Sequence, residues 1–183
     1  ITALKKIIGL QEGVVYTEKD IKKLRYGKIM VMTDQDHDGS HIKGLLMNVF
    51  HTLWSSLLER GYITSMITPI VKVSKGKNII SFYNLEDYKD WKDKHNAAKG
   101  WHIKYYKGLG TSNTKEAKEY FRDIKDVTYT WTGDVSHISM NLAFKKDQAD
   151  KRKGWLKDFQ PETHKNLDVN EKTVPVEDFI NKE

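Results

Sequence analysis

The sequence contains no cysteine, which excludes disulfide bonds and thiolate metal sites and is consistent with an intracellular protein. No apolar run approaches the roughly 18 residues that a membrane-spanning helix needs. No signal peptide opens the chain, and neither internal repeats nor low-complexity segments occur in it. These absences leave a soluble globular protein as the expected class.

The composition supports the same class and suggests a partner. The 183 residues are enough for one core, or for one domain with a small appendage. Hydrophobic residues make up 38% and charged residues 31% of the chain, which is typical of folded proteins. The net charge of +6 favours a polyanionic partner such as nucleic acid. Because the chain begins at Ile1 without a methionine and ends at Glu183 inside a predicted helix, we expect it to be a piece of a longer protein.

The most informative stretch is an acidic motif, residues 34–39, that follows the apolar run 29–32. Its aspartates alternate along the chain and precede a glycine: Asp34, Asp36, Asp38 and Gly39. This order predicts a buried strand that ends in an acidic loop, and the apolar stripe over 41–60 predicts a helix after it. Ligands of open α/β sheets bind beyond the carboxyl ends of strands. Crowded carboxylates repel one another, and oxygen ligands favour Mg²⁺, Mn²⁺ or Ca²⁺ over zinc. We therefore predict a metal site at the three aspartates, with His37 and His41 placed to touch a metal-bound water or a phosphate.

Three alternatives remain open for the acidic motif on the residues alone. An EF-hand loop would also begin with Asp34, Asp36, Asp38 and Gly39, but it needs a glutamate where this chain has Leu45, and a helix where it has an apparent strand. A solvated acidic turn without a ligand is the second alternative. A purely structural cation site is the third.

Periodicity and turn residues predict the other elements. Helices are expected over 1–10, 17–24, 85–95, 113–122, 136–145 and 147–159. Strands are expected over 79–83, 101–106 and 127–131, and Pro69 makes the range 63–73 an edge strand or two short strands. From residue 160 onward the chain is expected to be an extended connector as far as Val176.

Two further stretches could contact an anion. The glycine segment, residues 107–111, joins a predicted strand to a predicted helix, where it could approach a phosphate or simply form a tight turn. The basic cluster is Lys145, Lys146, Lys151, Arg152 and Lys153. Such a cluster is usually a solvated face, and it would contact phosphates without reading sequence if it bound nucleic acid.

Several segments resemble the TOPRIM region of type IIA DNA topoisomerases, of the eukaryotic kind or of a viral or protozoan relative. They are Leu-Arg-Tyr-Gly at 24–27, Thr-Asp-Gln-Asp-His-Asp-Gly-Ser-His-Ile-Lys-Gly at 33–44, Ile-Thr-Pro-Ile at 67–70, Lys-Tyr-Tyr-Lys-Gly-Leu-Gly-Thr at 104–111 and Asp-Phe-Ile-Asn-Lys-Glu at 178–183. The resemblance is colinear over essentially the whole chain.

The resemblance implies an α/β fold with a Rossmann-like, mainly parallel sheet, helices on both faces and a helical C-terminal extension. It divides the chain into a TOPRIM domain (1–122) that lacks its first strand, a helical extension (123–159) and a connector (160–183) toward a winged-helix domain. It assigns two Mg²⁺ sites to Asp34, Asp36 and Asp38, with Asp34 shared. It also assigns DNA contacts, at Lys28, Lys107, Gly108, Gly110, Arg152 and Lys153.

For the full enzyme the resemblance implies ATP-driven passage of double-stranded DNA, a homodimer, and a location in the nucleus of a eukaryote or in the cytoplasm or virion of a virus. The glutamate of the first metal site and the nucleophilic tyrosine belong to segments outside this chain, and Tyr105, Tyr106 and Tyr120 do not match that tyrosine. The chain alone is therefore expected to lack a catalytic residue and to be inactive. The alternatives are a TOPRIM domain of a nuclease or primase, and a non-catalytic basic DNA-binding module.

Overall fold

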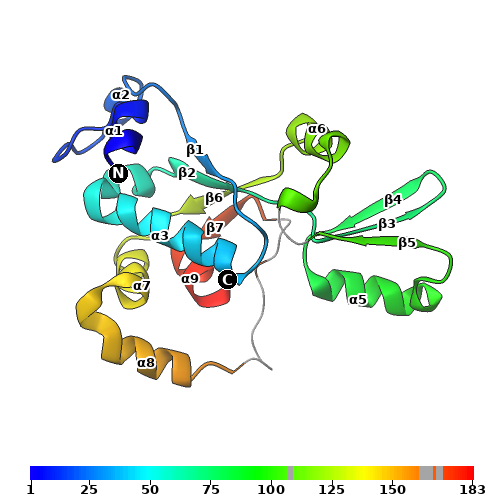
Figure 1. Ribbon diagram of the computed structural model, residues 1–183. Coiled ribbons are helices and arrows are strands. Elements are labelled where there is room, and N and C mark those ends of the chain that lie inside the picture. Colours follow the sequence, from blue (N-terminus) through cyan, green and yellow to red (C-terminus); the bar gives the residue numbers. More distant parts are fainter. Residues whose placement is uncertain (107–108, 161–166, 168–170) are drawn as a thin grey trace.

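The computed structural model describes residues 1–106, 109–160, 167 and 171–183. Within this part of the chain, the first of two β-sheets has the strand order β1-β2-β6-β7 (Figure 1). Its strands are β1 (Ile29–Val31), β2 (Ile63–Met66), β6 (Asp126–Thr130) and β7 (Thr173–Pro175). The pairs β1–β2 and β6–β7 are parallel, whereas β2 and β6 are antiparallel. The predicted α/β class with a mainly parallel sheet is confirmed.

Helices pack their apolar side chains against this sheet to form the larger core. They are α1 (Thr2–Ile8), α2 (Glu18–Ile21), α3 (His37–Leu53), α4 (Ser55–Glu59), α7 (Asp134–Phe144) and α9 (Val176–Lys182). The most deeply buried members of the core are Met47, Phe50, Leu57, Leu58, Ile63, Met140 and Val176. None of the helices in the described residues is long and apolar enough to cross a membrane.

The second sheet is antiparallel, with the strand order β4-β3-β5, and it has its own small core. It consists of β3 (Val71–Lys75), β4 (Asn78–Phe82) and β5 (His102–Tyr105), with α5 (Leu85–Lys94) and the 3₁₀ turn η1 (Asn96–Ala98) after the hairpin. Figure 1 shows this sheet and α5 extending away from the first sheet. Pro69 separates β2 from β3, which confirms the prediction of two short strands. That these strands belong to different sheets was not predicted.

The helix after the acidic motif differs from the prediction at both ends. We expected it over 41–60, but α3 begins at His37 and ends at Leu53, and α4 follows a break at Trp54. The early start has a local cause, because the Asp36 side chain accepts a hydrogen bond from the Gly39 N–H and caps the helix. Asp38 therefore lies in the first helical turn, not in a loop. A strand before the motif and a helix that begins within it also exclude the EF-hand alternative.

The segments after α6 (Thr114–Arg122) contribute to the first sheet and to its edges. The basic helix α8 (Ala149–Lys157) follows the 3₁₀ turn η3 (Lys146–Gln148), close to its predicted bounds. In the range expected to be a connector, β7 pairs with β6, and α9 packs on α7. The division at residues 122 and 159 stays a prediction, and the first sheet draws strands from all three ranges.

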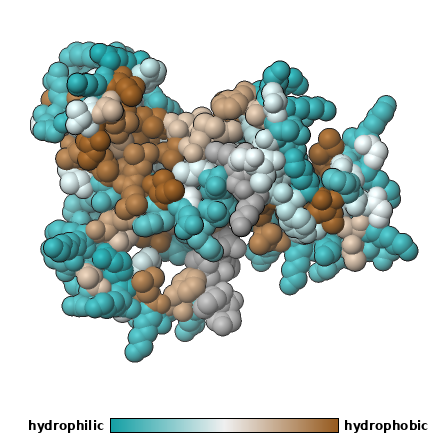
Figure 2. Space-filling view, viewed as in Figure 1, coloured by the Kyte–Doolittle hydropathy of each residue, from teal (hydrophilic) through white to brown (hydrophobic). Residues whose placement is uncertain are grey.

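Figure 2 shows apolar side chains gathered on the viewed face over α3 and the neighbouring β1. Exposed apolar residues in these parts of the chain include Met32, Ile42 and Leu45. Apolar patches of this kind are typical of surfaces that contact another segment or protein.

Candidate metal and DNA site

The acidic motif occupies the turn between β1 and α3. Asp36 is held at two points, because its Oδ1 accepts the Gly39 N–H at 2.8 Å and its carbonyl accepts the Ser40 N–H at 3.0 Å. The bond to Oδ1 orients the carboxylate at the N-terminus of α3, where the helix dipole stabilises a negative charge. The motif thus lies beyond the carboxyl end of a parallel strand, as predicted.

Gly39 permits the close turn that brings β1 into α3. A Cβ at this position would lie 1.9 Å from the carbonyl oxygen of Asp34, which is closer than any side chain can approach. The glycine therefore sets the distance between the strand end and the first helical turn. Gly39 is buried, while the three aspartates that precede it are exposed.

The three aspartates offer oxygen donors of the kind that Mg²⁺ prefers, but they do not form a complete cluster. Among the described residues, no group of three or more His, Asp or Glu side chains could together hold a metal ion. Magnesium is commonly held by one or two protein carboxylates together with water and phosphate oxygens. The donor chemistry of Asp34, Asp36 and Asp38 fits Mg²⁺ in this partial way.

A cavity of about 420 Å³ opens beside the motif, between the two sheets. Asp36, His37 and Ser40 line it from α3 and its N-cap, and Tyr83 and Asn84 line it from the link between β4 and α5. His37 and His41 are both exposed. Of the two histidines, His37 lines the cavity and His41 is not among the described residues that do so. The geometry therefore supports the predicted ligand contact of His37 better than that of His41.

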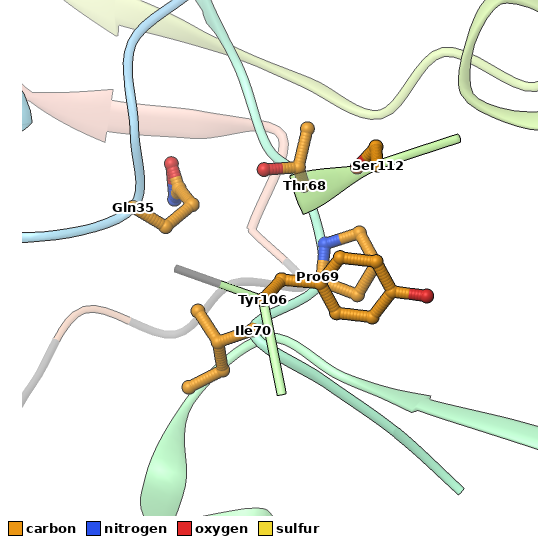
Figure 3. Close-up of a pocket in the computed structure, with 6 residues that line it drawn as sticks. All are labelled: Gln35, Thr68, Pro69, Ile70, Tyr106 and Ser112. Atoms are coloured by element: carbon orange, nitrogen blue, oxygen red, sulfur yellow. The ribbon is translucent and has the colours of Figure 1, made fainter. Parts of the chain in front are cut away.

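The residues on either side of the glycine segment, Tyr106 and Ser112, lie next to the acidic motif. Within the glycine segment, Lys107 and Gly108, predicted to contact DNA, lie outside the described residues, and the segment continues as the 3₁₀ turn η2 (Leu109–Thr111). A small cavity of about 10 Å³ is lined by Gln35 of the acidic motif, by Tyr106 before the segment and by Ser112 after it. Figure 3 shows Gln35 on one side of this cavity and Tyr106 and Ser112 on the other. The remaining predicted residue, Gly110, is exposed.

A carboxylate that the sequence analysis missed joins these flanks. The side chain of Glu116, in the first turn of α6, accepts hydrogen bonds from Lys104 Nζ at 2.8 and 2.7 Å, from the Tyr106 hydroxyl and from the Asn113 N–H at 2.8 Å. Burial raises the pKa of Glu116, but the hydrogen bonds from Lys104 and Tyr106 outweigh burial and lower this pKa to about 2. Burial and the bond to Glu116 raise the pKa of the Tyr106 phenol. The pattern Asn-x-x-Glu could have predicted a helix cap, but not the contacts with β5.

The predicted DNA contacts of the basic cluster differ in their surroundings. Arg152 donates from Nη1 to the carbonyls of Leu142 and Ala143, both at 2.8 Å, at the C-terminal end of α7. Lys153 is exposed and pairs with Asp150 at 3.0 Å. Lys28, before β1, is also exposed. Arg152 therefore has a structural contact that the sequence did not predict, while Lys28 and Lys153 remain accessible to a phosphate.

The sequence and fold of this chain match a known family. Residues 66–183 match the family described as the C-terminal associated domain of TOPRIM, and the chain belongs to that family. Over 93% of its length the chain is 49% identical to DNA topoisomerase 2 of Plasmodium falciparum, and over 97% it is 48% identical to DNA topoisomerase 2-alpha of Mus musculus. It spans 12% of the length of each of these relatives.

A solved structure agrees with the sequence relatives. The whole chain superimposes with a TM-score of 0.92 and 47% identity on 25% of a chain from the crystal structure of the Plasmodium falciparum topoisomerase II DNA-binding, cleavage and re-ligation domain. The resemblance to the TOPRIM region of type IIA topoisomerases, predicted from the sequence, is confirmed.

Proposed function

We propose that this chain is the Mg²⁺-binding TOPRIM portion of an ATP-dependent type IIA DNA topoisomerase, which cleaves and religates both strands of one duplex so that another can pass. The observation that carries the proposal is the acidic motif at the carboxyl end of β1, with the flanks of the glycine segment beside it. The similarity to topoisomerase 2 of several eukaryotes supports the reaction class.

In this proposal Asp34, Asp36 and Asp38 hold Mg²⁺ together with a glutamate from another part of the full enzyme. Bound Mg²⁺ supplies positive charge that stabilises the attacking and leaving oxygens at a DNA phosphate. Asp36 contributes a carboxylate that is already oriented by the Gly39 N–H. Its orientation reduces the ordering that binding requires.

The nucleophilic tyrosine comes from outside the chain in this proposal. Tyr106 is unsuited to the role because its hydroxyl donates to Glu116 and its pKa is raised, which keeps the phenol protonated. Tyr120 shares a hydrogen bond of 3.2 Å with Ser112. The chain alone is then inactive, and it acts within a homodimer in the nucleus that also carries an ATPase domain.

DNA contacts by Lys28, Lys153 and the glycine segment give this portion its second role. Lysines at phosphates bind without reading sequence and make binding dependent on salt. This agrees with the net charge of +6. A topoisomerase that acts on any duplex needs contacts of this kind.

Relaxation of supercoiled plasmid by the full enzyme, with Mg²⁺ and ATP, tests the proposal. Asparagine is as good a helix N-cap as aspartate, so Asp34→Asn combined with Asp36→Asn removes two charges and retains the cap of α3. We expect relaxation and Mg²⁺-dependent DNA cleavage to fall by at least about 100-fold. Asp93→Asn, an exposed carboxylate on α5, is the matched control and should leave both unchanged. Full cleavage by the double variant would contradict the proposal.

A further inference from the structure

We propose that Glu116 is a positioning residue that holds Tyr106 and Ser112, the two flanks of the glycine segment, beside Gln35 of the acidic motif. The proposal rests on the proposed function, because it assigns the glycine segment and the acidic motif to one site. It adds a residue from outside both motifs.

The contacts of Glu116 come from both sides of the glycine segment. Lys104 lies on β5 and Tyr106 directly after it, before the glycine segment. Asn113 lies after the segment and caps α6. Lys104 reaches both carboxylate oxygens, Tyr106 reaches Oε1, and the Asn113 N–H reaches Oε2. One side chain thus ties together the strand before the segment and the helix after it.

Glu116 is the more buried partner of this cluster. The Glu116 side chain is 12% exposed and that of Lys104 is 34% exposed. The Lys104 ammonium also lies 4.7 Å from the centre of the Tyr106 ring, where a cation is attracted to the ring face. A partly buried carboxylate with several donors is costly to separate from them, because each donor would remain unpaired.

The cluster is connected to the acidic motif through Tyr106 and Ser112. The Tyr106 N–H donates to the Ile70 carbonyl at 2.8 Å, and both Tyr106 and Ser112 line the small cavity that Gln35 lines from the opposite side (Figure 3). A shift of α6 relative to β5 would therefore change the spacing between the glycine segment and the aspartates. Catalysis is sensitive to such shifts, since a displacement of about 1 Å can lower a rate by about 100-fold.

Helix α6 also provides a matched control. Glu119, in the same helix, pairs with Lys72 of β3 at 3.2 Å. This ion pair also ties α6 to the second sheet, and Lys72 lies 5.8 Å from the centre of the Tyr106 ring. Glu119 itself hydrogen-bonds neither Tyr106 nor Asn113 among the contacts of the described residues. Glu119→Gln should weaken the contact of α6 with β3 while leaving the hydrogen bonds from Tyr106 and Asn113 to Glu116 in place.

The test compares Glu116→Gln, Glu116→Ala and Glu119→Gln in the full enzyme. Glutamine at the third helical position still forms a capping box, so Glu116→Gln removes the charge opposite Lys104 and keeps the cap. We expect the kcat of DNA cleavage to fall about tenfold in Glu116→Gln and about 100-fold in Glu116→Ala, with KM for DNA within about twofold of the parent value. Hydrogen exchange of the amides at 109–113 should accelerate in both Glu116 variants and not in Glu119→Gln.

Three results would overturn the proposal. The first is an unchanged kcat in Glu116→Ala when the double variant Asp34→Asn with Asp36→Asn has lost cleavage. This result would overturn the positioning role and leave the proposed function intact. The second is an equal loss in the Glu116 and Glu119 variants. The third is a loss that tracks only the fraction of folded enzyme, measured by thermal unfolding. Unchanged cleavage in the double aspartate variant would instead overturn the proposed function, and the positioning role with it. If Glu116→Ala does not fold, Tyr106→Phe removes one contact of the cluster and should lower kcat by several-fold.

Discussion

Glu183, at the C-terminal end of α9, forms an ion pair with Lys43 in the middle of α3, and the Lys43 side chain is only 3% exposed. The same Glu183 oxygen accepts the Ser40 hydroxyl at 2.8 Å, and the ammonium group lies 5.6 Å from the centre of the Phe179 ring. This carboxylate therefore holds α9 against the first turns of the helix that begins with the acidic motif. The position of Lys43 was predictable in part, since it lies on the face of α3 that buries Gly39, Met47 and Phe50.

Glu183→Ala tests the strength of this contact. Removing one partner of a buried pair leaves the other charge unpaired, and we expect the free energy of unfolding of the full enzyme's TOPRIM portion to fall by about 2–3 kcal/mol. Urea unfolding followed by tryptophan fluorescence measures it. Asp178→Asn removes the exposed pair with Lys182 and should change this free energy by less than about 1 kcal/mol. Equal effects of the two variants would show that the Lys43 pair is not stabilising.

Gly39→Ala is expected to disrupt the turn at the acidic motif. Because its Cβ would meet the Asp34 carbonyl oxygen at 1.9 Å, either β1 or the first turn of α3 must move. We expect the free energy of unfolding to fall by about 3 kcal/mol and plasmid relaxation to be lost. Gly154→Ala is the control, since a Cβ there meets nothing within 4 Å on α8. In a helix this change should raise stability by about 0.5–1 kcal/mol. A Gly39→Ala enzyme with normal stability would contradict the close approach of these two segments.

Local signals made the strand, the acidic motif and several helices predictable. The helix predicted over 17–24, for example, is present as α2 and begins with a capping box of Thr17 and Asp20. The start of α3 was missed because the alternating aspartates suggested a loop, whereas Asp36 alone is a sufficient N-cap. Sheet membership was missed for a different reason. The pairing of β6 with β7 joins residues about 45 positions apart, as in Tyr129 with Val174, and such pairing depends on tertiary packing.

The candidate site was predicted as a set of residues, not as an arrangement. The motif predicts a metal site at Asp34 and Asp36, while the proposed contacts that orient this region come from Glu116 and Glu183. Glu183 belongs to a segment that carries the family resemblance and Glu116 to a helix-capping pattern, but neither pattern indicates the contacts that the structure shows. Their roles depend on which donors the fold brings within 3 Å, and periodicity carries no information on that.

The ionisation of Glu116 makes a prediction about pH. Its pKa is lowered from 4.5 to about 2 in the folded protein, so its ionised form is stabilised by folding. The stability that it contributes is fully present above about pH 4.5 and is lost as the pH falls toward about 2. We expect the difference in the free energy of unfolding between the parent protein and Glu116→Gln to be constant from pH 7 to about 5 and to shrink below about 4.5. Urea unfolding at a series of pH values measures this difference. A difference that stays constant down to the acid limit of folding would show that the charge of Glu116 does not contribute.

Replacing Arg152 by alanine should lower the free energy of unfolding, whereas replacing its neighbour Lys153 should leave it almost unchanged. Arg152 donates to carbonyls at the end of α7, so Arg152→Ala should lower the free energy of unfolding by about 1–2 kcal/mol. Lys153 has an exposed side chain that pairs with the exposed Asp150, and Lys153→Ala should leave stability within about 0.5 kcal/mol of the parent value. If Lys153 contacts a DNA phosphate, its loss should reduce the slope of log K against log salt by about 1, equally for unrelated duplexes.

Fluorescence anisotropy with a labelled duplex at several salt concentrations measures this slope for the full enzyme. Lys89→Ala, on α5 of the second sheet, serves as the control because it removes the same charge far along the chain from the basic cluster. A slope that falls equally in Lys89→Ala and Lys153→Ala would mean that only the net charge matters. A slope that falls in Lys153→Ala alone would place DNA along α8. A double variant, Arg152→Ala with Gly154→Ala, offsets the loss of stability caused by Arg152→Ala. If the slope is still lowered in this double variant, then Arg152 contributes to DNA binding through the position of α8.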